Sequence, residues 1–187
     1  MKQKTLILLL MLFSGFAFAQ TAQQTQPAPT APQTPAVNTD VPLAHLLGWL
    51  VGKWEGEGMS GDQEFLGQME GSKQLDDQAI LLMRESSSKT GGIAGGRKEI
   101  MIIGYEGATK KILLSVHGSN NTLLIYSGEL KNQEIVFSLV IPAPQAGYVH
   151  RRSFRVLPNG GVAFAIEAGS PGKAPGKTVE INFKKKS

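Results

Sequence analysis

Cysteine is absent from this 187-residue sequence. The chain therefore has no disulfide bond, no thiol nucleophile and no cysteine that could carry a lipid anchor. Enzyme motifs are missing too: there is no His-Glu-x-x-His, no Gly-x-Ser-x-Gly and no pair of histidines at metal-ligand spacing. These absences predict a protein that is not an enzyme, with no catalytic residues and no metal site.

Long apolar runs are also missing. The longest, residues 6–13, is too short to cross a membrane as a helix. It follows Lys2 and Lys4 and precedes the small-x-small triplet at residues 17–19, which is the order of parts in a secretory signal peptide. We therefore predict a signal peptide over residues 1–19 and a periplasmic or secreted protein. The apolar run argues against the alternative of a transit peptide.

Residues 20–40 contain mostly Gln, Thr, Ala and Pro and almost no charge. A segment of this composition cannot bury a core, so we predict a disordered linker that is either a spacer or a passive leader. The folded domain is then expected over residues 41–187.

The charge of the expected domain is uneven. Residues 41–145 carry nine basic and twelve acidic side chains, whereas residues 146–187 carry eight basic and two acidic ones. The run Lys184–Lys186 is read either as a solvated end or as an attraction for an anionic lipid or ligand. Nucleic-acid binding is not expected, because exposed aromatic residues are not interleaved with the basic ones.

A short helix is predicted at the start of the domain. Leu43, Leu46, Leu47 and Leu50 recur at helical spacing and form one apolar stripe. Pro42 suits the first helical turn, with Thr39 or Asp40 as the cap before it, and Gly52 can end the helix.

From Gly52 onward the period changes to two, which is typical of a strand. Trp54, Gly56 and Gly58 then share one face. In a barrel this arrangement would close one end: the helix lies across the opening, the indole fills the floor, and the glycines let the first strand bend.

Short apolar runs separated by turn residues fill the remainder of the chain. Strands are predicted near residues 53–60, 63–75, 79–88, 97–105, 110–118, 122–131, 134–141, 148–157, 161–169 and 178–185. Consecutive strands joined by short turns favour an all-β, antiparallel up-and-down barrel of about ten strands, because closure removes the exposed sheet edges. A β-sandwich is the alternative.

Candidate ligand contacts lie near residues 148–157. Alternation places Tyr148, His150, Arg152 and Phe154 on one face, so basic and aromatic groups occur together. Phe164 belongs to the apolar face of the next strand. A barrel of this size has room for one small ligand, and an apolar cavity with a few cationic groups suits an amphipathic anion. Arg152 or Arg155 could bind its carboxylate through two parallel hydrogen bonds.

The opening residues also resemble known families. Residues 52–54 (GKW), after a short helix, are similar to the Gly-x-Trp that opens the lipocalin and fatty-acid-binding (calycin-like) barrels. Residues 46–58 (LLGWLVGKWEGEG) resemble uncharacterised exported bacterial proteins with an LxGxWxGxG opening, and also the nitrobindins, which are ten-stranded barrels that bind haem. Similar stretches occur at residues 97–114, 152–156 and 179–185. The resemblance implies a ligand-binding barrel.

One position departs from the nitrobindin pattern. There a histidine on the last strand holds the haem iron, and the corresponding residue in this chain is Thr178, which cannot replace an imidazole. Among the histidines, His45 is expected in solvent, His117 at the barrel rim, and only His150 near an interior face. We therefore expect no cofactor. The inward faces of residues 148–157 and 178–185 stay open at this point.

The sequence leaves three function classes. The first is an exported, non-catalytic module that binds a small apolar or amphipathic molecule through Tyr148, His150, Arg152, Phe154 and Phe164. The second is a haem or nitric-oxide protein with a displaced ligand such as His150. The third is an enzyme that acts on a lipid-like substrate.

Overall fold

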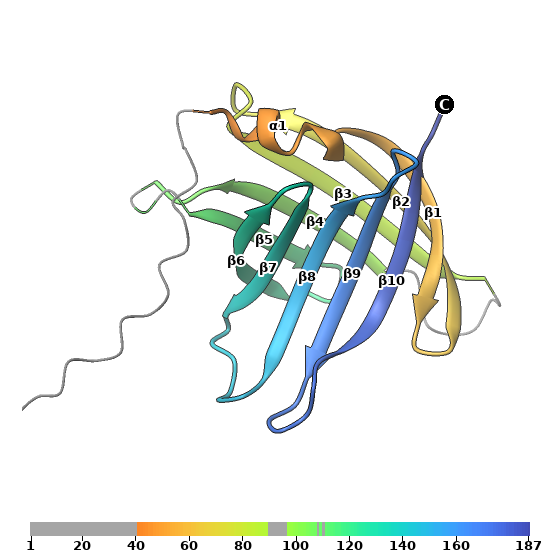
Figure 1. The fold of residues 1–187 in the computed structure, drawn as a ribbon, viewed down its shortest axis with the longest axis vertical. Coiled ribbons are helices and arrows are strands. Elements are labelled where there is room, and N and C mark those ends of the chain that lie inside the picture. The colour runs from red at the N-terminus through yellow and green to blue at the C-terminus, as the bar shows by residue number, and fades with distance from the viewer. Residues whose placement is uncertain (1–40, 90–96, 108, 110) are drawn as a thin grey trace, which may run out of the picture. The chain divides into compact units, whose positions relative to one another are not determined.

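The computed structural model of the chain describes residues 41–89, 97–107, 109 and 111–187. Two helical turns come first, α1 (Leu43–Leu46) and the 3-10 turn η1 (Gly48–Leu50), and ten strands follow (Figure 1). The strands are β1 (Gly52–Ser60), β2 (Gln63–Gln74), β3 (Ala79–Ser88), β4 (Arg97–Tyr105), β5 (Ile112–Gly118), β6 (Leu123–Lys131), β7 (Glu134–Ile141), β8 (Val149–Val156), β9 (Val162–Gly169) and β10 (Gly176–Lys185). The predicted signal peptide and linker lie outside the described residues.

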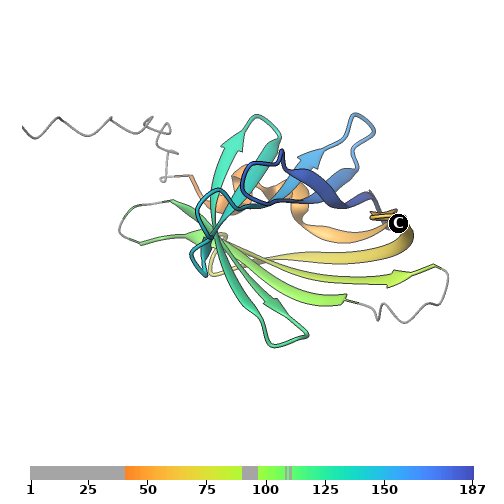
Figure 2. The same cartoon turned by 90° about the horizontal axis from the view of Figure 1, so that it is seen from below.

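The strands form one closed barrel. Each strand pairs antiparallel with its neighbours in the chain, and β1 pairs antiparallel with β10 to complete the ring. Figure 2 shows β1–β4 on one side of the barrel and β7–β10 on the other. The predicted antiparallel up-and-down barrel with a short N-terminal helix is therefore confirmed. Within the described residues, no helix is long and apolar enough to cross a membrane.

Burial alternates along the strands and assigns the inward faces that the sequence left open. On β8, Arg152 and Phe154 are buried and His150 is half-buried, so this face points inward. On β10, Ile181 and Phe183 are buried, whereas Thr178 and Asn182 are exposed. Tyr148 precedes β8 instead of belonging to it, because the strand begins at Val149.

The helical segment covers the barrel end where β1 begins. Leu43, Leu47 and Leu50 are fully buried and join the apolar core. Two hydrogen bonds anchor the segment: the Ala44 backbone N–H donates to the Asp77 carbonyl, and the Tyr105 hydroxyl donates to the Val41 carbonyl. The helix therefore lies over the β2–β3 turn at this end (Figure 1).

Two details of the predicted helix are wrong. Pro42 is the residue before the helix, with an extended ψ of 136°, and not part of the first turn. The helix also breaks at Leu47, where ψ is 16°, and resumes as a 3-10 turn that aims Leu50 at the barrel. The predicted caps, Thr39 and Asp40, lie outside the described residues.

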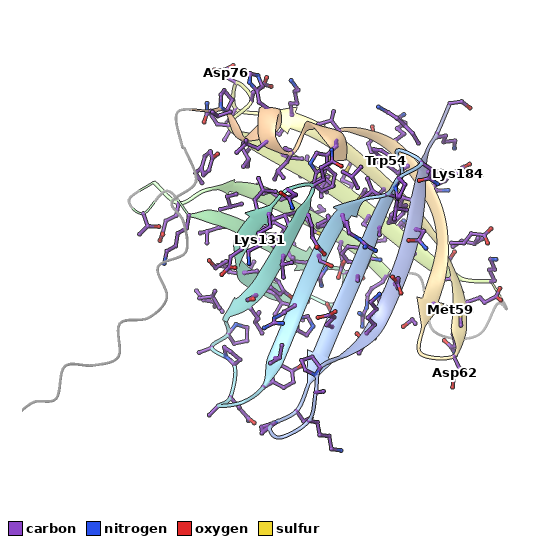
Figure 3. The ribbon with its side chains drawn as sticks, in the orientation of Figure 1. Trp54, Met59, Asp62, Asp76, Lys131 and Lys184 are labelled. Atoms are coloured by element: carbon purple, nitrogen blue, oxygen red, sulfur yellow. The ribbon has the colours of Figure 1, made fainter. Side chains whose placement is uncertain are left out.

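Trp54 lies beside the helical segment at the start of β1, while Met59 and Asp62 lie at the other end of this hairpin (Figure 3). The Trp54 indole is buried, and its N–H donates to the Leu50 carbonyl over 3.2 Å. Gly52, with φ of +126°, occupies backbone space that side chains rarely adopt and connects the 3-10 turn to the strand.

Gly58 allows β1 and β10 to approach closely. A Cβ atom at this position would lie 1.8 Å from the carbonyl oxygen of Glu180 and 2.6 Å from the Cα of Ile181. Since both contacts are to backbone, no side-chain rotation could relieve them. Gly56 is in the same situation, with 2.4 Å to the Asn182 oxygen. These glycines permit the coiling that closes the barrel.

Gly58→Ala should therefore destabilise the protein by about 3 kcal/mol, because the added methyl group pushes two paired strands apart. The matched control is Gly104→Ala on β4, where a Cβ would meet no atom within 4 Å. Its free energy of unfolding should change by less than about 1 kcal/mol. Urea denaturation of both variants makes the comparison, and equal stabilities would contradict this account of barrel closure.

Candidate functional site

Five polar side chains meet inside the barrel: Arg84 from β3, Glu99 from β4, Tyr126 from β6, and His150 and Arg152 from β8. Alternation explains their direction, since each shares the inward face of its strand with buried apolar residues. The group lies beyond the apolar core that the helical segment covers. We call it the polar cluster.

The Glu99 carboxylate joins two guanidinium groups. Arg152 donates to both of its oxygens, Nη2 to Oε1 and Nη1 to Oε2, each over 2.9 Å. Arg84 donates to Oε2 from Nη2 over 2.7 Å and from Nε over 3.1 Å. All three side chains are at most 5 % exposed. Glu99 and Arg84 come from adjacent strands, whereas Arg152 reaches the carboxylate from β8.

The surroundings shift the pKa of each charged group. Burial alone would raise the pKa of Glu99, but the hydrogen bonds from Arg152 and the charge of Arg84 outweigh it and lower the pKa to about 2. Burial lowers the pKa of Arg84, while the hydrogen bonds to Glu99 overcome burial and raise the pKa of Arg152. Both guanidiniums stay protonated at neutral pH.

Positive charge therefore exceeds negative charge in the polar cluster. Two guanidiniums share one carboxylate, and Arg97, which is exposed where β4 begins, lies two residues from Glu99 on the same side of the strand. Aromatic faces stabilise part of this charge: the Arg84 guanidinium lies 4.7 Å from the centre of the Phe164 ring, and that of Arg152 lies 5.5 Å from the Tyr126 ring. Rings carry no formal charge, so a net positive charge remains.

A chain of hydrogen bonds leads from Arg152 to His150. Nε of Arg152 donates to the Tyr126 hydroxyl oxygen over 3.1 Å, and this hydroxyl lies 3.2 Å from Nδ1 of His150. An arginine can only donate, whereas the Tyr126 hydroxyl can both donate and accept, so either neutral tautomer of His150 completes this chain of hydrogen bonds. Burial and the Arg152 charge lower the pKa of His150, so the ring is neutral at pH 7.

The predicted ligand contacts occupy three environments. Phe154 and Phe164 are fully buried and pack together with ring centres 5.0 Å apart. Arg152 is buried in the polar cluster, and His150 is half-buried at its edge. Tyr148 is exposed and stacks on His150, with ring centres 6.5 Å apart. His150 therefore connects the buried part of the cluster to the surface.

Sequence reasoning missed Arg84, Glu99 and Tyr126. Their signal was a single polar or charged residue on the otherwise apolar face of a strand, such as Arg84 after Ile80 and Leu82. Such a residue must find a partner, because a buried unpaired charge is costly. Which partner it finds depends on strands distant in sequence, and a single sequence does not reveal it.

The other positions considered for metal or haem ligation point away from the interior. Thr178 is exposed, and its hydroxyl donates to the Ile166 carbonyl over 3.2 Å at a bulge in β10. His45 is exposed, with Nε2 3.9 Å from the Asp77 carboxylate, and His117 is exposed on β5. Among the described residues, no three His, Asp or Glu side chains are grouped as metal ligands are.

The fold is thus a closed antiparallel barrel of ten strands with a polar group in its interior. The comparison with solved structures agrees: Rv2717c from M. tuberculosis superposes with a TM-score of 0.58 and 14% sequence identity. The match covers 79% of this chain and 99% of that protein. No protein family and no curated protein matches the sequence. The similarity at this level of identity concerns the fold.

Glu99→Gln should destabilise the protein by about 3–5 kcal/mol, because it leaves two buried guanidiniums without their anion. The matched control is Glu85→Gln on the outer face of β3, where an exposed ion pair with Lys98 is lost. That control should cost less than about 1 kcal/mol. Urea denaturation measures both, and a Glu99 variant as stable as the control would show that the carboxylate does not hold the cluster.

The same carboxylate should make stability depend on pH. Its pKa is about 2 in the folded protein and 4.5 is its ordinary value. The stabilisation is therefore present above about pH 4.5 and is lost as the pH falls towards 2. Between about pH 5.5 and pH 3 the wild type should lose roughly 2 kcal/mol more unfolding free energy than Glu99→Gln. Parallel losses in the two proteins would contradict the low pKa.

Proposed function

We propose that the barrel is a non-catalytic binding module for one small amphipathic anion. The anion enters at the end opposite the helical segment and places its acidic group near His150 and Arg97. The observation that carries this proposal is the surplus of positive charge in the polar cluster, where two buried guanidiniums share a single carboxylate.

Burying an uncompensated cation costs free energy. Such a charge is tolerated when a counter-ion or hydrogen bonds offset it. Arg97, on the same side of the strand as Glu99, adds a second positive charge towards the end where β4 begins. His150 adds a neutral imidazole at the edge of the cluster. Together these groups suit a carboxylate, sulfonate or phosphate.

Apolar residues on the neighbouring inward faces would contact the rest of the ligand. Leu124 on β6, Leu139 on β7 and Val179 on β10 are partly buried and pack against the core. Each lies near the strand end that is remote from the helical segment, as His150 does. An amphipathic molecule would satisfy both the charged and the apolar groups.

The predicted signal peptide makes this an exported carrier or receptor. No nucleic acid is expected as a partner, in keeping with the charge distribution of the sequence.

Haem is the alternative ligand, and the residues present fit it poorly. The position expected to hold iron is Thr178, which is exposed on β10. His150 is neutral, which favours metal binding, but its Nδ1 is engaged in the hydrogen bond with Tyr126, so only Nε2 is left for a metal. A Soret band that develops on titration with haemin and is lost in His150→Ala would favour haem instead.

Binding of 1-anilinonaphthalene-8-sulfonate, a fluorescent amphipathic anion, tests the proposal. We expect one saturable site, and roughly tenfold weaker binding in both Arg97→Gln and His150→Ala, because each loses a donor to the charged group. The uncharged dye N-phenyl-1-naphthylamine should bind more weakly than the anion and should be insensitive to Arg97→Gln. Native mass spectrometry of protein purified from its own source would then identify the natural ligand by mass.

The matched control for this titration is Arg151→Gln. Arg151 follows His150 on β8 but is exposed on the outer face. Its loss changes the net charge as Arg97→Gln does, and it should leave the affinity unchanged. Equal effects of the two arginine substitutions would mean that long-range charge, and not a site at the barrel end, attracts the dye.

A further inference from the structure

A groove of about 640 Å³ lies on the outer face of the barrel, and its lining includes the strand segments that carry Arg84 and Glu99 of the polar cluster. It crosses the wall formed by β1–β5. Its outward-facing lining comprises Lys53, Gln68, Glu70, Met83, Glu85, Lys98, Ile100, His117, Ser119 and Lys186. Residues between them, such as Arg84 and Glu99, turn their side chains into the barrel. We call this feature the outer groove.

Strand register aligns the floor of the outer groove in one transverse row. Lys53 pairs with Glu70, Glu70 with Met83, Met83 with Ile100, and Ile100 with His117. Neighbouring strands are about 4.8 Å apart, so the row spans roughly 19 Å from β1 to β5. That length and the volume of the groove are in the range of sites for small elongated molecules.

The centre of the row is apolar and exposed. Met83 is 47% and Ile100 48% exposed, although they face outward from an antiparallel sheet, where polar residues are normal. Ile102 on the same face of β4 is also exposed. Apolar side chains gathered in a concave surface indicate a binding site more often than scattered ones do.

The β1 end of the outer groove has a surplus of positive charge. Lys53 on β1 approaches Glu70 on β2 to 3.9 Å. Lys186 lies next to Lys53, since its backbone N–H donates to the Lys53 carbonyl over 2.8 Å. No carboxylate of the described residues forms an ion pair with Lys186, so two ammonium groups, those of Lys53 and Lys186, face the single carboxylate of Glu70.

We propose that the outer groove binds a free alkyl carboxylate. Its chain lies across Met83 and Ile100, and its carboxylate contacts Lys186 and Lys53. The charge surplus at one end of an apolar floor matches the polarity of such a ligand, and a concave groove fits a single chain better than it fits a flat bilayer. The polar cluster faces the other side of the same barrel wall, so the barrel would hold amphipathic anions at two places.

Methyl NMR of the full chain, labelled at the methionine methyl groups, tests this site with dodecanoate below its micelle concentration. Met83 reports on the outer groove. Met101 reports on the interior, because its sulfur lies 3.9 Å from Nη1 of Arg152. Met59, exposed on β1, reports on non-specific binding. We expect a saturable shift at Met83 and none at Met59.

Variants of the groove should weaken this shift. Ile100→Ser should raise the Kd at least about tenfold through lost apolar contact, and Lys186→Gln about threefold through one exposed ionic contact. Val140→Ser is the matched control, because Val140 is exposed on β7, outside the lining of the groove. It should leave the Kd unchanged. Thermal melts of all three variants check that the fold is intact.

Several outcomes would overturn the outer-groove site. A shift at Met101 without one at Met83 would remove the outer-groove site and leave the proposed function intact. A shift at Met83 without one at Met101 would support the outer-groove site and count against binding inside the barrel. Co-sedimentation with phosphatidylglycerol vesicles, abolished by Ile100→Ser, would mean that the groove docks on a membrane. A Met83 shift that depends on protein concentration without dodecanoate, together with dimers in sedimentation, would assign the groove to a second copy of the chain.

Discussion

The Glu99 carboxylate is the contact on which the interior of this barrel depends. It accepts hydrogen bonds from Arg84 on the adjacent strand and from Arg152 on β8, so one side chain ties two parts of the ring together. A buried charge of this kind costs free energy unless its partners are well placed. Its value therefore lies in selecting one arrangement of the strands, because any shift in register would separate three charges inside an apolar environment.

The interior is divided along its axis into an apolar part and a polar part. Leu43, Leu47 and Leu50 fill the end where β1 begins, and the polar cluster occupies the region beyond it. This division explains the role of the helical segment. Its leucines cover the apolar end of the barrel and keep water away from side chains that cannot form hydrogen bonds. It also leaves His150 at the edge of the cluster, where a solute can reach it.

Alternation and turn residues were enough to predict the barrel, because a strand with one buried face has a clear period of two. They divided the residues of β8 into two faces but did not say which face points inward. Nor did they give the partners of that face, since Arg152 and Glu99 are 53 residues apart. For β10 the sequence did not decide whether the apolar face or the face of Thr178 points inward. The bulge near Thr178 arises from pairing with β9, which the local sequence does not encode. Pro42 was misplaced by one position because the φ of proline suits both the cap and the first turn.

The seam between β1 and β10 joins the first and last strands, with Trp54 opposite Lys185. The ring therefore cannot close until β10 has been synthesised, and every earlier intermediate has two open sheet edges. Contacts between such distant residues form slowly compared with those of helical proteins. A chain that is folding in a crowded compartment is thus exposed to edge-to-edge association for as long as its final strand is missing. Pairing of β10 with β1 covers both open edges and thereby ends the risk of edge-to-edge association.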